Sequence, residues 1–149
     1  MRAVVQRVLD SEVKVDNKVI GSINEGLCVL LGVGNKDTKE DADYLIDKII
    51  NLRVFDDEDG KMNLSAKDLN REIMVISQFT LYGDCRSGRR PGYSEAASPG
   101  KAEKLYDYFI DKIKETELKV ANGEFKAYMN VSLNNDGPVT LLIDSKKEF

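Results

Sequence analysis

Histidine is absent from the 149 residues, and this absence excludes more chemistry than any other feature of the composition. Without histidine, the chain cannot activate a nucleophile through a Ser-His-Asp or Cys-His arrangement. Metal sites built on histidine are excluded for the same reason. We therefore expect no metal site and no cofactor.

Cysteine is scarce, because the only two residues of this type are Cys28 and Cys85. They lie far apart and form no C-x-x-C pair, so the sequence excludes a structural zinc site and indicates no disulfide framework. Free thiols are typical of proteins in a reducing compartment. We therefore expect a cytoplasmic protein.

Long apolar runs are also missing. The longest one, Leu27–Val33, is far shorter than the roughly 18 residues that a membrane-spanning helix needs. Arg2 and Arg7 interrupt the apolar residues at the start of the chain, so no secretory signal is expected. We expect a soluble protein with no membrane contact.

An excess of positive charge is absent as well, since the net charge is −4 and the pI is about 5.0. A protein that coats nucleic acid by neutralising phosphates should be basic. Any contact with nucleic acid should therefore be local. Length and composition, with 42% hydrophobic and 32% charged residues, are typical of one globular domain over residues 1–149.

Hydrophobic periodicity predicts the first half of the chain in some detail. Residues 13–23 alternate as two strands around a turn at Asp16-Asn17, and Leu27–Val33 reads as a buried strand. Apolar residues at helical spacing predict a helix over 39–52 and a second helix that begins at Pro99.

The other segments are expected to be strands. We predict one strand over 73–82, which would place Gln78 and Thr80 on one face. Residues 125–143 suggest two more strands, joined by a hairpin turn at 135–138. The predicted class is α+β (mixed α/β), a single domain whose antiparallel or mixed sheet forms a barrel-like core with two packed helices.

Two loops raise the question of ligands. The acidic segment 56–60 resembles a calcium loop, but its alignment places Ala66 where an acidic ligand is needed, so we interpret it as a solvated turn. The loop over 83–100 is long and carries a basic cluster of Arg86, Arg89 and Arg90. The sequence is compatible with a solvated loop and with an arm that contacts phosphates.

Two polar segments carry a family resemblance. Residues 77–81, Ser-Gln-Phe-Thr-Leu, and 135–140, Asn-Asp-Gly-Pro-Val-Thr, resemble the paired signature motifs of the D-aminoacyl-tRNA deacylases. The similarity covers the whole chain and includes the opening segment 1–8, the stretch 60–64 and the approach to the second helix at 97–99.

The resemblance implies a homodimeric hydrolase that acts in the proofreading of translation. It would hydrolyse the ester between a D-amino acid and the 3′ end of tRNA, release both products, remove mischarged glycine and reject L-aminoacyl-tRNA. The active site would lie at the subunit interface. By this resemblance, the catalytic wall consists of Ser77, Gln78, Phe79 and Thr80. A chiral filter would come from the other subunit and consist of Gly137 and Pro138 in the cis form. The terminal adenine would be held by Phe125 and Met129.

The chemistry suits a chain without histidine. An aminoacyl ester is already activated, and the adjacent ribose hydroxyl can assist its hydrolysis, so backbone N–H groups near Phe79 and Thr80 could serve as the oxyanion site. Two alternatives stay open. One is a non-catalytic module that binds tRNA or DNA, and the other is an esterase with Thr80 or Cys85 as its nucleophile.

Overall fold

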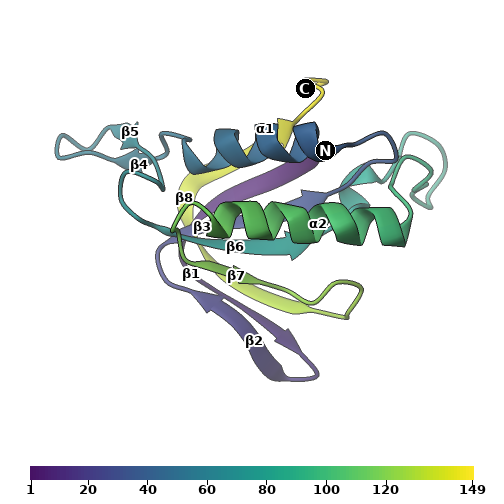
Figure 1. The fold of residues 1–149 in the computed structure, drawn as a ribbon, viewed down its shortest axis with the longest axis horizontal. Coiled ribbons are helices and arrows are strands. Elements are labelled where there is room, and N and C mark those ends of the chain that lie inside the picture. The colour runs from purple at the N-terminus through teal and green to yellow at the C-terminus, as the bar shows by residue number, and fades with distance from the viewer.

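A curved, mixed sheet of six strands organises the chain, which is described over all residues 1–149 by a computed structural model (Figure 1). The strands are β1 (Arg2–Val15), β2 (Lys18–Ile23), β3 (Gly26–Gly32), β6 (Glu72–Ser77), β7 (Val120–Asn122) and β8 (Asn130–Asp144). Strand β1 pairs with β8 along one edge and with both β2 and β3 along the other. The sheet curls so that β2 comes close to β7. A Cβ added to Gly21 of β2 would lie only 3.0 Å from the carbonyl oxygen of Asn122 in β7. This confirms the expected barrel-like mixed sheet.

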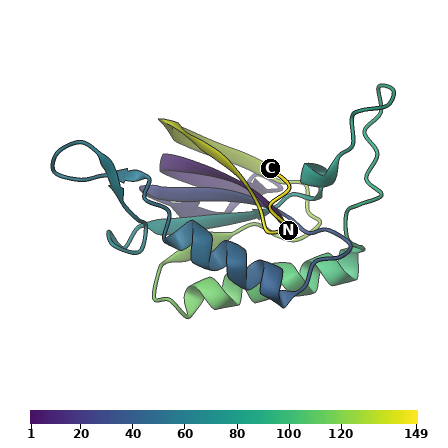
Figure 2. The same cartoon turned by 90° about the horizontal axis from the view of Figure 1, so that it is seen from above.

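Two helices cover one face of this sheet (Figures 1 and 2). Strands β3, β6 and β7 run parallel, and parallel neighbours need crossover connections. Helix α1 (Lys39–Ile50) and the small hairpin of β4 (Phe55–Asp56) and β5 (Met62–Leu64) lie between β3 and β6. Helix α2 (Pro99–Lys114) connects β6 to β7. Neither helix is long and apolar enough to cross a membrane.

Local signals start both helices where the sequence predicts. Before α1, the Asp41 carboxylate accepts from the Thr38 backbone N–H at 2.9 Å, which satisfies a group that has no partner within the helix. Ser98 precedes α2, and Pro99 is its first residue. The acidic segment 56–60 forms the turn between β4 and β5, where the Asp57 carboxylate accepts from two backbone N–H groups.

Alternation along the strands builds two apolar clusters. Odd positions of β3 and β6, such as Leu27 and Ile73, pack toward the helices in the larger cluster. Even positions, such as Cys28 and Met74, belong to a smaller cluster on the other face, inside the curl. Both faces of the central strands are therefore buried, which explains their nearly continuous apolar sequences.

The prediction of one strand over 73–82 is wrong at its end. Strand β6 stops at Ser77, and Phe79–Tyr82 form a short 3-10 helix, η1. The partner strands end at this level, since β3 ends at Gly32 and β7 pairs only as far as Val75. Beyond them the backbone has no ladder to join, so Gln78 and Thr80 do not share a strand face.

The hairpin turn predicted at 135–138 is also wrong. A single strand, β8, runs through this segment, and Phe125 lies in the loop before it. Strand β1 provides a continuous partner, because pairing resumes on both sides of register shifts near Val8. The turn-forming residues Asn135–Pro138 are accommodated as an irregularity within the strand rather than as a reversal of the chain.

Candidate active site

A largely apolar cavity of about 550 Å³ lies at the carboxyl ends of the parallel strands β3 and β6. This end of a parallel sheet is where α/β folds commonly bind ligands. The cavity is bounded by the end of β6, the start of α2 and the loop between β7 and β8. Representative lining residues are Leu31, Ser77, Gln78, Phe79, Tyr106 and Met129.

One wall of the cavity is the transition from β6 to η1. The Gln78 backbone N–H donates to the Leu31 carbonyl at 2.8 Å, which holds the last extended residue against β3. Phe79 follows with 58% of its surface exposed, and its ring meets the edge of Tyr93 at a centroid distance of 5.0 Å. Ser77, Gln78 and Phe79 line the cavity directly, whereas Thr80 lies just outside it.

The start of η1 offers two backbone donors beside this wall. The first bonds of the helix run from the Leu81 N–H to the Gln78 carbonyl at 3.3 Å and from the Gly83 N–H to the Thr80 carbonyl at 2.9 Å. The N–H groups of Phe79 and Thr80 precede this ladder and have no acceptor within it. Unpaired N–H groups at a helix start are suited to an anion or an oxyanion.

The Thr80 hydroxyl has no base beside it. It accepts a hydrogen bond from the side-chain amide of Gln78, and an amide does not take up a proton at neutral pH. A threonine hydroxyl needs such a base to become a nucleophile. The geometry therefore favours an orienting role for this pair of side chains.

A buried carboxylate anchors the far end of η1. The Tyr82 hydroxyl donates to Asp37 at 3.1 Å, and the Gly34 backbone N–H donates to the same oxygen at 2.6 Å. The other Asp37 oxygen lies 2.8 Å from the amino group of Met1. Burial raises the pKa of the Tyr82 hydroxyl and the Asp37 carboxylate raises it further, so Tyr82 remains a donor at neutral pH.

The opposite wall comes from the segment before β8. Phe125 packs against Tyr106 at a centroid distance of 5.8 Å, and Met129 lies next to Gly123. The Tyr106 hydroxyl donates to the carbonyls of Val75 at 2.8 Å and Gly123 at 3.3 Å, and burial raises its pKa. Tyr106 thereby connects both walls to α2.

Charge is almost absent from the cavity. Of its 16 lining residues, 12 are hydrophobic, and Lys126 is the single charged one. No carboxylate lines the cavity, so its walls hold no side chain that could act as a general base at neutral pH. A larger hollow of about 670 Å³ lies beyond Tyr82, and several of its charged side chains form pairs, such as Arg2–Asp144 and Arg86–Asp84.

The Gly137-Pro138 motif lies far from this cavity in the chain. Its peptide bond is cis, as the resemblance implies, and both residues are exposed. The motif lies on β8 close to Arg7 of β1. In the sheet, β8 is three strands away from β6. Strand spacing and rise put it about 14 Å across the sheet and about 13 Å along the strands from Ser77.

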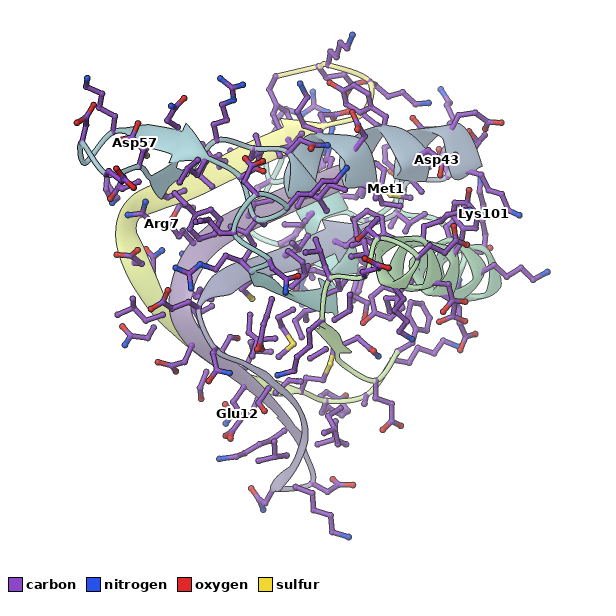
Figure 3. All side chains as sticks on the ribbon, turned by 60° about the vertical axis from the view of Figure 1, so that its left-hand side comes forward. Met1, Arg7, Glu12, Asp43, Asp57 and Lys101 are labelled. Atoms are coloured by element: carbon purple, nitrogen blue, oxygen red, sulfur yellow. The ribbon has the colours of Figure 1, made fainter.

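Partly buried polar contacts tie this motif to β1. The Asn135 side-chain amide donates to the carbonyls of Arg7 at 2.9 Å and Val139 at 3.2 Å. Asp136 lies 2.7 Å from Arg7 Nε, while Arg7 Nη1 donates to the Val54 carbonyl at 2.6 Å. Figure 3 shows Arg7 beside the bend of β8.

The structure therefore groups the residues singled out in the sequence into two sets. It brings Ser77, Gln78, Phe79, Phe125 and Met129 together around one cavity, with Thr80 adjoining. It leaves Gly137 and Pro138 on an exposed ridge elsewhere. The sequence analysis missed the roles of Tyr82 and Tyr106, because their apolar neighbours gave no sign that each hydroxyl joins separate elements.

Comparison with protein families identifies one that matches most of the chain. The family model described as D-Tyr-tRNA(Tyr) deacylase matches residues 4–144. A protein of Thermosipho melanesiensis named D-aminoacyl-tRNA deacylase is 65% identical over the full length of both chains. A protein of the same name from Clostridioides difficile is 59% identical, also over both full lengths.

Two solved structures share the fold. The structure titled c-Myc DNA Unwinding Element Binding Protein has a TM-score of 0.91 and 41% identity, and the match covers 97% of this chain and 98% of that one. A probable eukaryotic D-amino acid tRNA deacylase has a TM-score of 0.82, with coverage of 96% and 98%. Its identity of 16% supports the similarity of fold alone.

Proposed function

The chain belongs to the D-Tyr-tRNA(Tyr) deacylase family and is therefore a hydrolase of the ester bond in D-aminoacyl-tRNA, and we propose how it selects its substrates. It removes D-amino acids and glycine from the 3′ end of tRNA and leaves L-aminoacyl-tRNA intact. The observation that carries the hydrolytic step is the pair of N–H groups of Phe79 and Thr80 at the rim of an apolar cavity that holds no carboxylate, and selection rests on the exposed Gly137-Pro138 backbone.

The cavity suits the terminal adenosine of tRNA. A flat, weakly polar base gains most from apolar and aromatic walls, which Phe125 and Met129 provide. With the base held there, the ester at the ribose would lie toward the start of η1. The carbonyl oxygen would then develop its negative charge against the N–H groups of Phe79 and Thr80.

The nucleophilic step is proposed to use the substrate's own hydroxyl. The terminal 2′-hydroxyl adjoins the ester before binding, so it can assist the attacking water without a side-chain base. The Thr80 hydroxyl contacts only an amide, which supports this assignment over an acyl-threonine intermediate. The protein contributes orientation and the two backbone donors, each of which is typically worth about 3–4 kcal/mol.

The chiral filter is proposed to come from a second copy of the chain. Gly137-Pro138 lies too far from Ser77 to share a site within one chain, yet it is exposed on β8. Strand β8 pairs only with β1, so a 15-residue edge stays open to a partner. A two-fold dimer would let each Gly137-Pro138 ridge reach the other subunit's cavity.

Selection would then rest on backbone atoms. Gly137 carries no Cβ, so its backbone can approach the substrate Cα closely. A substituent in the L configuration would collide with this ridge, whereas a D side chain would point away from it. Glycine has no substituent to collide and would be accepted.

Ester loss from matched substrates tests the proposal. The protein is incubated with D-tyrosyl-, L-tyrosyl- and glycyl-tRNA, and with D-tyrosyl-tRNA that ends in 2′-deoxyadenosine. We expect hydrolysis of the D and glycyl esters, no hydrolysis of the L ester, and almost none of the 2′-deoxy ester despite normal binding. Similar rates on D and L esters would contradict the filter, and full activity on the 2′-deoxy substrate would restore a side-chain nucleophile.

A DNA-binding function is the second candidate. The solved structure with 41% identity is titled as a DNA-unwinding-element binding protein, and the arginine-containing loop provides local positive charge. The net charge of −4 disfavours it. Binding to duplex DNA at physiological salt as tight as to tRNA, without ester hydrolysis, would support the DNA-binding alternative.

A further inference from the structure

A hairpin projects from the rim of the cavity between η1 and α2, and we name residues Asp84–Gly92 the arginine arm. Its two ends are joined by backbone hydrogen bonds, of 2.7 Å from the Asp84 N–H and 2.9 Å from the Gly92 N–H. Figure 2 shows the connection between η1 and α2 extending well beyond the sheet and the helices. The arm is thus a defined projection rather than a collapsed loop.

The base of the arm adjoins the cavity wall through Phe79, and Asp84, Cys85 and Arg86 line the neighbouring hollow beyond Tyr82. Tyr93 directly follows it and meets the ring of Phe79 edge-on. Gly83 directly precedes it, and a Cβ there would lie 3.2 Å from the Tyr93 ring. Any molecule that leaves the cavity past Phe79 therefore passes next to the arm.

Two of the three arginines in the arm have no protein partner. Arg86 Nε and Nη2 donate to the two Asp84 oxygens at 2.9 and 2.8 Å, and this bond lowers the pKa of the Asp84 carboxyl well below its usual range. Arg89 and Arg90 are exposed and form no ion pair or side-chain hydrogen bond. The pairing thus singles out Arg89 and Arg90 as free cations.

This arrangement is unusual within the molecule. The arginines that form ion pairs are Arg2, Arg7, Arg71 and Arg86. Of the unpaired ones, Arg53 stands alone, whereas Arg89 and Arg90 are adjacent and lie on the projecting arm of a chain with net charge −4. Lys126 adds a further unpaired cation at the cavity.

We infer that Arg89 and Arg90 bind backbone phosphates of the tRNA acceptor end that precede the nucleotide held in the cavity. The inference rests on the proposed function, because that function places the terminal adenosine next to the arm. Guanidinium groups fit phosphate oxygens with two parallel hydrogen bonds. The arm would supply affinity that is independent of sequence and sensitive to salt, while the chemistry stays at η1.

The test compares the double variant R89A/R90A with K61A/K67A, which removes two exposed lysines elsewhere on the surface and gives the same net charge. We expect R89A/R90A to raise KM for D-tyrosyl-tRNA at least about tenfold, with kcat unchanged. The slope of log affinity for uncharged tRNA against log salt should fall by about 1.5, since each phosphate contact contributes about 0.7–0.9. The lysine variant should match the wild type in both measurements.

A short substrate separates failure of the arm from failure of the proposed function. The D-tyrosyl ester of adenosine lacks the preceding phosphates, so wild type and R89A/R90A should hydrolyse it equally. If the wild type cleaves D-tyrosyl-tRNA but both double variants share its KM and salt slope, the inference is wrong. Loss of the short-substrate activity in R89A/R90A would also overturn it, by showing that the arm shapes the cavity. A wild type that cleaves neither ester would instead contradict the proposed function.

Discussion

Residues 77–82 and 135–138 both break the regular pairing of a strand, but they do so in opposite ways. At Ser77 the strand ends, and the chain turns into η1 beside a cavity with apolar walls. At Asn135–Pro138 the strand continues, and the irregular residues stand exposed on an outer edge. The first segment lines a cavity, and the second exposes its backbone at Gly137 and Pro138.

Under the proposed function, each motif is incomplete in one chain. The cavity has walls and donors but nothing that would distinguish one hand of a substrate from the other. The Gly137-Pro138 ridge has exposed backbone, but neither residue lines the apolar cavity. A dimer of two identical chains can join these two halves, because it can bring the ridge of one chain to the cavity of the other.

The largest expected effect comes from removing the support of the ridge. Arg7→Met breaks the contacts of a buried guanidinium with Asp136 and the Val54 carbonyl. The buried Val54 carbonyl loses its donor and the partly exposed Asp136 loses its cation, which together cost roughly 3 kcal/mol. Urea unfolding should show this decrease, and D-ester hydrolysis should fall with it. The control Arg71→Met, in a more exposed pair with Glu25, should cost less than about 1 kcal/mol. Equal losses in the two variants would show that Arg7 has no special role.

A smaller change on the ridge itself should separate activity from stability. A Cβ on Gly137 meets no atom within 4 Å, so Gly137→Ala should change the free energy of unfolding by less than about 1 kcal/mol. Deacylation should nevertheless fall about 100-fold, as expected when a reacting group is displaced by an ångström. Gly100→Ala, also in open space, is the matched control and should keep normal activity. Normal activity of Gly137→Ala would leave the ridge without a role in the reaction.

The smallest effect is expected in the concave region. Thr80→Ala removes a hydroxyl that contacts Gln78 but keeps the backbone N–H. Loss of one hydrogen bond of about 1 kcal/mol predicts a fivefold decrease in kcat at most. Single-turnover kinetics would measure it, with Thr80→Ser as the variant that retains a hydroxyl. A complete loss of activity in Thr80→Ala that Thr80→Ser rescues, or a trapped acyl-Thr80 adduct, would show that the Thr80 hydroxyl itself reacts. The larger effect would then come from residues 77–82 and not from residues 135–138.

The parts of the fold with local causes were predictable. Helix α1 follows from its apolar spacing and the Thr38–Asp41 capping pair, and α2 from Pro99 after Ser98. The hairpin prediction at 135–138 failed because turn propensity is local, whereas the pairing of β8 with β1 is a long-range interaction. The short strand β7 escaped notice because three residues carry no detectable period.

The site was predictable only as a set of residues and not as a shape. The resemblance pointed to Phe79 and Phe125, which the structure places on one cavity. The end of β6 could not be foreseen, because it depends on where β3 and β7 stop. Tyr82 was missed for a similar reason, since its partner Asp37 is 45 residues away in the sequence.

The pairing of β1 with β8 also has a consequence for how the chain folds. Arg2 lies opposite Asp144, so the first strand of the sheet is completed by the last one. Contacts between such distant residues slow folding, because the loop between them must close before the contacts form. During synthesis β1 can pair early with β2 and β3, but its other edge must wait until β8 has been made. A chain arrested before β8 would keep this edge open and be prone to aggregation.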